Sequence, residues 1–143
     1  MSSTINKMNE RALFKQSWHQ VERDGIVLQS SPLLAQYADV LVHAFTTRIG
    51  GQSQAPLEHF NLGRHIDDEA ARHDAMQNRQ RLCRILGADH SRLVVPGQVH
   101  SSTVVFVDKP VERHVLQKVD GVTTKEKRLP LLLHFADLSL IHI

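Results

Sequence analysis

One segment with a helical pattern, residues 67–86, stands among segments that have the pattern of short strands. Its small and apolar residues recur at spacings of three and four, which places them on one helix face: Ala71, Ala75, Asn78, Leu82 and Ile85. The acidic residues at 67–69 suit the N-terminal end of a helix, and Gly87 suits the position just after its C-terminal end. A helix of this length among several strands predicts an α+β fold, with a mixed sheet covered by helices.

The strand patterns are short and separated by turn residues. Residues 18–21 and 26–29 flank Asp24-Gly25, a pair that favours the tight turn of a hairpin. Leu33, Leu34 and Tyr37 fit one helical turn packed on the sheet. The remaining predicted strands are rich in apolar or β-branched residues: 40–46, 92–96, 103–108 and 129–135, of which the last is predicted to be central.

The composition excludes several classes of protein. A net charge of +2 gives no electrostatic reason to expect a nucleic-acid or membrane partner. The chain contains no run of eighteen apolar residues, as a membrane span requires, and no signal-peptide pattern. Cys83 is the single cysteine, which rules out an internal disulfide and predicts a reducing, cytoplasmic location. Its thiol is expected to be partly buried and inert.

A set of short motifs follows a fixed order along the chain: Thr47-Arg48-x-Gly50-Gly51, Phe60-Asn61-Leu62-Gly63, Asn78-Arg79, Gln98-Val99-His100, Asp120-Gly121 and Ala136-Asp137. No single motif is specific, but their order and spacing resemble the polyphenol oxidase/purine nucleoside phosphorylase family, also called the laccase-domain family. The resemblance implies a layered α/β/β/α sandwich, of which this chain holds the N-terminal part.

The resemblance also implies a metal site. Members of the family bind a metal, expected here to be zinc rather than copper, through the histidine of Gln-Val-His, a cysteine after Ala-Asp, and a second histidine further on. His100 matches the first ligand, whereas Leu138 stands where the cysteine is expected. A lone histidine near a strand end is more often structural, so the expected role of His100 as a ligand depends on the resemblance.

The last six residues, 138–143, have the sequence Leu-Ser-Leu-Ile-His-Ile. This hexapeptide is the translation of the end of a transposon adapter used in sequencing libraries. Our hypothesis is that 1–137 is the N-terminal part of a single laccase-like domain and that 138–143 is an artefact, so that His142 is not the missing ligand. Sequencing the genomic locus with independent primers would test it, and an encoded 138–143 would refute it.

The resemblance implies activity on purine nucleosides: phosphorolysis of adenosine, inosine and S-methyl-5′-thioadenosine, and deamination of adenosine. Phosphorolysis requires a cationic site for phosphate, and Arg48 beside Gly50 and Gly51 is the best candidate. The alternative is that Arg48 pairs with a carboxylate and that the glycines only form a turn. Asn61 is a candidate catalytic residue that contacts the ribose, and His65 is a candidate substrate-binding residue; Asn61 can equally organise its own turn. For Arg79 we expect a structural role on a helix face. Asp120 either binds substrate or starts a turn, and we favour the turn.

Two other functional classes remain open. One is a copper polyphenol oxidase, although a multicopper site needs many histidines placed by a complete fold. The other is a non-enzymatic, truncated fragment. The sequence does not indicate an oligomeric state.

Overall fold

The structure is a computed structural model that describes residues 18–63 and 68–135. The chain divides into two compact units, Met1–Asn61 and Leu62–Ile143. Helices and strands both occur, as the predicted α+β class requires. Within the described residues the strands pair in both antiparallel and parallel fashion, in three small sheets of which one is antiparallel and two are parallel.

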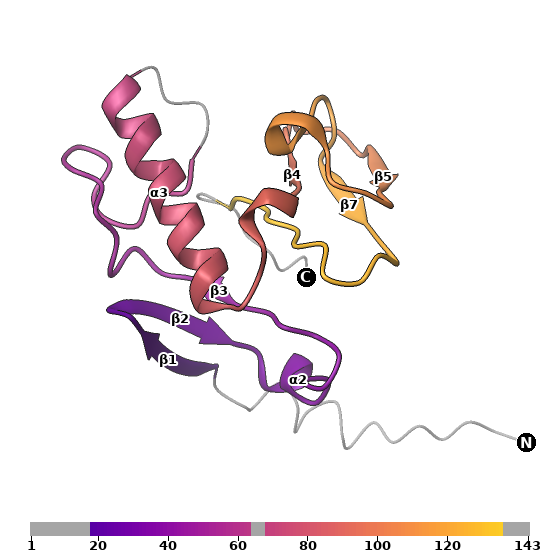
Figure 1. The fold of residues 1–143 in the computed structure, drawn as a ribbon, viewed down its shortest axis with the longest axis horizontal. Helices are drawn as coiled ribbons and strands as arrows, with labels where there is room; N and C mark the ends of the chain where they lie inside the picture. The colour runs from indigo at the N-terminus through magenta and orange to yellow at the C-terminus, as the bar shows by residue number, and fades with distance from the viewer. Residues whose placement is uncertain (1–17, 64–67, 136–143) are drawn as a thin grey trace, which may run out of the picture. The chain divides into compact units, whose positions relative to one another are not determined.

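The first unit is built on a hairpin. Strand β1 (His19–Arg23) pairs antiparallel with β2 (Ile26–Ser30), with Arg23 opposite Ile26. Asp24 and Gly25 form the turn at φ 51° and 73°, the positive values that the Asp-Gly pair predicted. Strand β3 (Phe45–Thr46) pairs with the other edge of β2, so β2 is the middle strand (Figure 1).

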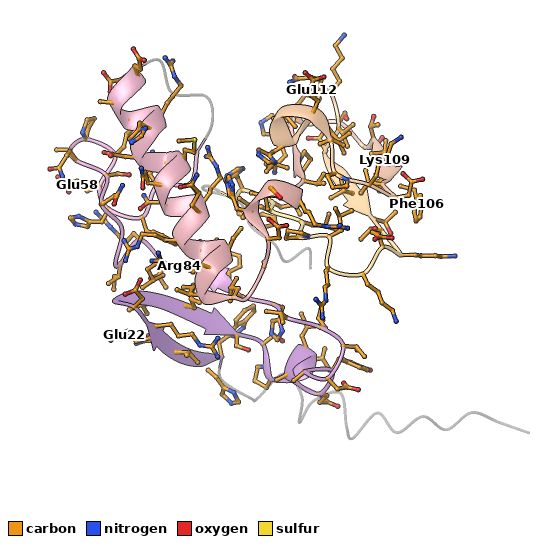
Figure 2. All side chains as sticks on the ribbon, viewed as in Figure 1. Glu22, Glu58, Arg84, Phe106, Lys109 and Glu112 are labelled. Carbon is orange, nitrogen blue, oxygen red and sulfur yellow. The ribbon has the colours of Figure 1, made fainter. Side chains whose placement is uncertain are left out.

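Only the middle strand of this sheet is well buried. Ile26, Val27 and Leu28 on β2 are buried, whereas every residue of β1 is exposed, among them Glu22, labelled in Figure 2. Burial of three consecutive side chains means that β2 is covered on both faces, so it carries the core of the unit.

Two predictions in this unit need correction. The predicted strand 40–46 is wrong for residues 40–44, because only β3 pairs with a neighbour and Val40 is 80% exposed. The helical turn is present as α2 (Pro32–Ala35), but Leu33, Leu34 and Tyr37 are exposed rather than packed on the sheet. Apolar composition alone predicted burial in both places, and burial needs a neighbour that the local sequence does not specify.

Helix α3 (Glu69–Ile85) confirms the strongest sequence prediction. The Asp68 carboxylate caps it by accepting the Ala71 N–H at 2.7 Å, and Arg84 lies in its last turn (Figure 2). Gly87 follows at φ 68°. The predicted face is buried at its centre, at Ala75, Asn78 and Leu82.

Cys83 on α3 is also buried, in a cluster with Leu93 and Val95. Burial raises the pKa of its thiol, with the negative charge of Asp89 adding to the effect. A buried thiol with a raised pKa is a poor nucleophile, as the sequence predicted.

The rest of the second unit consists of short elements: η1 (His90–Arg92), β4 (Val95–Pro96), β5 (Val104–Phe106), η2 (Glu112–His114), β6 (Val115–Leu116) and β7 (Gly121–Thr123). β4 pairs in parallel with β6. β5 pairs in parallel with β7, and these two strands lie side by side in Figure 1. The predicted strands 92–96 and 103–108 are therefore present but shorter, and each pairs with a strand that lies further along the chain.

The predicted central strand 129–135 is wrong in this structure. Among the described residues a single bridge joins it to a neighbour, between Leu131 and Val94, although Val94 also bonds to Pro130 and Leu132 through its backbone. Pro130 has no N–H to donate, and among the described residues only this one side of the segment is paired. Leu129 is nevertheless buried, in a cluster with Val94 and Val107. Ala136, Asp137 and the hexapeptide 138–143 lie outside the described residues.

No helix among residues 18–63 and 68–135 is long and apolar enough to cross a membrane.

Candidate functional site

His100 lies in the loop between β4 and β5, which we call the His100 loop and define as residues 97–102. Gln98 and His100 have φ values of 44° and 61°, in the left-handed region that residues with a side chain seldom adopt. Such a conformation costs roughly 1–2 kcal/mol per residue. The loop must therefore be held in place by specific contacts.

Asp120 makes several of these contacts. Its carboxylate accepts the backbone N–H of His100 at 2.7 Å, the N–H of Ser101 at 3.0 Å and the Ser101 hydroxyl at 2.6 Å. The hydroxyl bond is the main cause of a lowered pKa for Asp120, with the backbone bonds acting in the same direction. The favoured structural role of Asp120 thus has a definite form, because this carboxylate holds the backbone that presents His100.

The imidazole of His100 is exposed, and within the described residues its ring nitrogens have no hydrogen-bond partner. Nothing in this part of the chain competes with a metal for the ring, so His100 fits the role of one zinc ligand. It does not complete a site: no three His, Cys, Asp or Glu side chains within residues 18–63 and 68–135 gather into a metal-binding group.

Arg48 lies in the turn that follows β3, in the first unit. The turn rests on β2, since the Thr47 hydroxyl and N–H both donate to the Val27 carbonyl, at 2.8 and 3.2 Å. The Arg48 carbonyl accepts the Phe60 N–H at 3.1 Å, so the backbone of Arg48 is fixed. Its side chain is exposed, and among the described residues no carboxylate lies within ion-pair distance of the guanidinium. The alternative in which Arg48 pairs with a carboxylate has no support in this part of the chain.

Gly50 and Gly51 occupy positions where a side chain would collide with the backbone. A Cβ atom on Gly50, which has φ 95°, would overlap the Gly25 carbonyl, and one on Gly51 would overlap the His59 carbonyl. The glycines therefore have a steric reason to be present, whether or not their N–H groups also bind an anion.

The other predicted residues have different outcomes. Asn61 is half-buried, at the last position of the first unit. His65 lies outside the described residues. Arg79 is structural as predicted, because its Nη1 donates to the carbonyls of Leu62 and Gly63 at 2.7 Å each.

The structure thus gathers Arg48, Gly50 and Gly51 in one turn of the first unit, and places His100 in the second. The sequence indicated no separate role for Gln98 and favoured only a turn for Asp120, although both bond to residues far along the chain. Only their membership of the ordered motif set could have signalled a role.

The sequence model of the family described as multi-copper polyphenol oxidoreductase laccase matches residues 42–141. The chain belongs to this family. The match covers every candidate site residue, namely Arg48, Gly50, Gly51, Asn61, His65 and His100.

Curated relatives carry the other name of the family. The chain is 37% identical over 94 residues to a purine nucleoside phosphorylase of Corynebacterium glutamicum, covering 65% of this chain and 37% of the relative. It is 35% identical over 104 residues to the purine nucleoside phosphorylase YlmD of Bacillus subtilis, covering 68% and 37%. The aligned region thus spans somewhat over a third of the length of these relatives.

Solved structures of the family share the fold. YlmD of Geobacillus stearothermophilus matches with a TM-score of 0.69 and 31% identity, over 84% of this chain and 44% of that protein. The hypothetical protein YfiH of Bacillus licheniformis matches with a TM-score of 0.67 and 26% identity, over the same shares. The small sheets and the helix described above are therefore an arrangement that family members share.

Proposed function

We propose that this chain is the N-terminal part of a purine nucleoside phosphorylase that acts on adenosine, inosine and S-methyl-5′-thioadenosine and also deaminates adenosine. The names of the relatives support the phosphorylase activity, and the exposed guanidinium of Arg48 on a fixed backbone is the observation that carries it. A reducing, cytoplasmic location belongs to the proposal, and the single buried Cys83 suits it.

In phosphorolysis an oxygen of phosphate forms a bond to C1′ of the ribose while the bond from C1′ to the base nitrogen breaks. The base keeps the electron pair and takes up a proton, and ribose 1-phosphate remains. The guanidinium of Arg48 would hold two phosphate oxygens in a bidentate contact and orient one of the other two toward C1′. The N–H groups of Gly50 and Gly51 would add to this anion site.

The other site residues have proposed roles of their own. Asn61 would bind a ribose hydroxyl, and His65 would contact the substrate. His100 would hold zinc together with ligands from outside the described residues; a bound zinc ion supplies Lewis-acid polarisation and a more acidic water. In deamination a water oxygen bonds to the purine carbon that carries the amino group, and the bond to that group breaks to release ammonia and leave inosine. That reaction does not need the phosphate site.

Product analysis tests this function directly. The full-length protein is incubated with adenosine, with and without phosphate, and the bases, nucleosides and sugar phosphates are separated. Adenine and ribose 1-phosphate that depend on phosphate support phosphorylase activity, and inosine supports deaminase activity. If a zinc-loaded protein formed neither product, the proposal would be contradicted.

Arg48→Lys separates the two activities. A lysine provides a point charge but not a planar fork, so we expect phosphorolysis to fall about tenfold or more, as for the loss of a charge-assisted bond of ~1.5–3 kcal/mol. Deamination should change much less. Arg23→Lys, a change at another exposed arginine of the same unit, is the control. Equal losses in both activities would instead indicate a structural role for Arg48.

A copper polyphenol oxidase is the second candidate, since the family description names multi-copper polyphenol oxidoreductases. Oxygen uptake with a phenolic substrate and added copper tests it. Oxidation of the phenol without any nucleoside activity would favour this reading.

The non-enzymatic alternative concerns the 143-residue chain by itself. We expect this chain to be inactive and poorly soluble, and to bind zinc weakly. It carries large exposed apolar side chains, among them Val40, Val104 and Phe106, the last labelled on β5 in Figure 2. Exposed apolar strands promote aggregation. Light scattering, metal analysis and nucleobase release check the prediction, and a monodisperse, zinc-loaded, active chain would refute it.

A further inference from the structure

The side chain of Gln98 forms a reciprocal pair of hydrogen bonds with the backbone of a residue far along the chain. Its Nε2 donates to the His134 carbonyl at 2.8 Å, and its Oε1 accepts the His134 N–H at 2.9 Å. The two residues are 36 positions apart in the sequence. The amide head of Gln98 thus bonds to both backbone groups of one residue, as a neighbouring strand would.

His134 is itself anchored through its imidazole. The ring Nε2 bonds to the Leu62 carbonyl at 2.9 Å, and since a carbonyl only accepts, this nitrogen carries the hydrogen. The same carbonyl accepts from Arg79 at 2.7 Å. The pair between Gln98 and His134 is therefore connected to the Asn-Leu-Gly turn and to α3.

The backbone of the His100 loop is held at a second place. The Gln98 N–H donates to the Val119 carbonyl at 2.8 Å, and the next residue, Asp120, binds the N–H groups of His100 and Ser101. One side of the loop is thus fixed by residues 119 and 120, and the side chain of Gln98 ties it to residue 134. Together these contacts offset the unfavourable φ values of Gln98 and His100.

We propose that Gln98 is a positioning residue, which sets the His100 loop at a fixed place beside the His134 backbone, from which the chain continues to residue 136. The inference rests on the proposed function, in which His100 and residues that follow in the chain act together. Gln98 would not touch substrate or metal; it would set the position of the loop that does.

The chemistry of the pair explains why this residue is a glutamine. Contact with both an N–H and a C=O requires a donor and an acceptor on one flat group, and a neutral amide provides them. Glutamate keeps the acceptor but places a second oxygen against the His134 carbonyl. Methionine has nearly the same length and shape but neither bond, and leaves two backbone groups without a protein partner.

The test uses the full-length protein with Gln98→Met and Gln98→Glu, and Gln117→Met as the control at an exposed glutamine nearby. Two quantities are measured: amide hydrogen exchange at residues 98–101 and 134, and zinc affinity by competition with a chromophoric chelator. In Gln98→Met we expect faster exchange at both places and zinc affinity lowered about 10–100-fold, the range for a residue that orients a ligand. Excess zinc should restore turnover, which a misfolded variant would not allow. Gln98→Glu should fall between wild type and Gln98→Met, and the control should match wild type.

Three results would overturn the inference. If wild type binds zinc and Gln98→Met binds it equally well with unchanged exchange, the positioning role is wrong and the proposed function stands. If Gln98→Glu binds zinc more tightly than wild type, this side chain lies at the metal itself. If wild type binds no zinc, the proposed role of His100 fails and the positioning role fails with it.

Discussion

His100→Ala in the full-length protein should abolish adenine release from adenosine. Residues that merely orient a metal ligand contribute about 10–100-fold, so loss of a ligand should exceed 100-fold. The exposed ring of His100, with its nitrogens unengaged by the described residues, is what the change removes. Chromatography of the bases formed in phosphate buffer measures the effect, and metal analysis of the same samples should show less bound zinc.

His73→Ala is the matched control for this experiment. His73 is an exposed histidine on α3 whose ring bonds to Gln77 one helical turn away. Its removal should leave both turnover and metal content unchanged. Wild-type turnover and zinc content in His100→Ala would contradict the ligand role and return His100 to a structural one.

Gly51→Ala should prevent stable folding of the first unit. The new methyl group would overlap the His59 carbonyl and the Phe60 backbone, and Phe60 is buried. Ordinary overpacking costs about 1–3 kcal/mol when side chains can shift. Here the added methyl group would meet backbone atoms, and that backbone is held by hydrogen bonds. The His59 carbonyl accepts the Ser53 N–H at 3.0 Å, and the Phe60 N–H donates to the Arg48 carbonyl. The loss should therefore exceed that range, measured as the free energy of unfolding in urea.

Gly25→Ala provides the comparison. Gly25 has φ 73° but no atom within 4 Å of the added Cβ, so only the left-handed conformation is penalised, by roughly 1–2 kcal/mol. A loss for Gly51→Ala no larger than this would mean that the Arg48 turn can relax away from residues 59–60.

The sequence predicted those parts of the fold whose causes are local. The Asp24-Gly25 hairpin needs two positive φ values, and α3 needs one apolar face, an acidic cap and a terminal glycine; each signal lies within the element itself. The strand predictions for residues 40–44 and 129–135 were wrong for the opposite reason, because their causes are not local. Whether an apolar run becomes a strand depends on pairing with a distant neighbour, and an apolar run looks the same with or without one.

For the candidate site too, the sequence predicted some features and not others. The order of the motifs led to Arg48 and His100 through resemblance, but it did not explain why those motifs occur together. Part of the reason is now visible in the contacts between them: Arg79 and His134 meet at the Leu62 carbonyl, Gln98 pairs with His134, and Asp120 binds the backbone of His100. Such contacts join residues far apart in the chain, and no local pattern predicts them.

The distances along the chain between the His100 loop and its anchors also bear on how the protein is made. Asp120 follows His100 by 20 residues, and His134 follows Gln98 by 36. On a ribosome, α3 can form as soon as it emerges, because its hydrogen bonds are local. The His100 loop must wait until both later segments have left the exit tunnel, and it must then offset the entropy of closing two long loops. Nascent chains stalled before residue 134 should therefore hold a formed helix and a loose His100 loop, so that the candidate site is among the last parts to take shape.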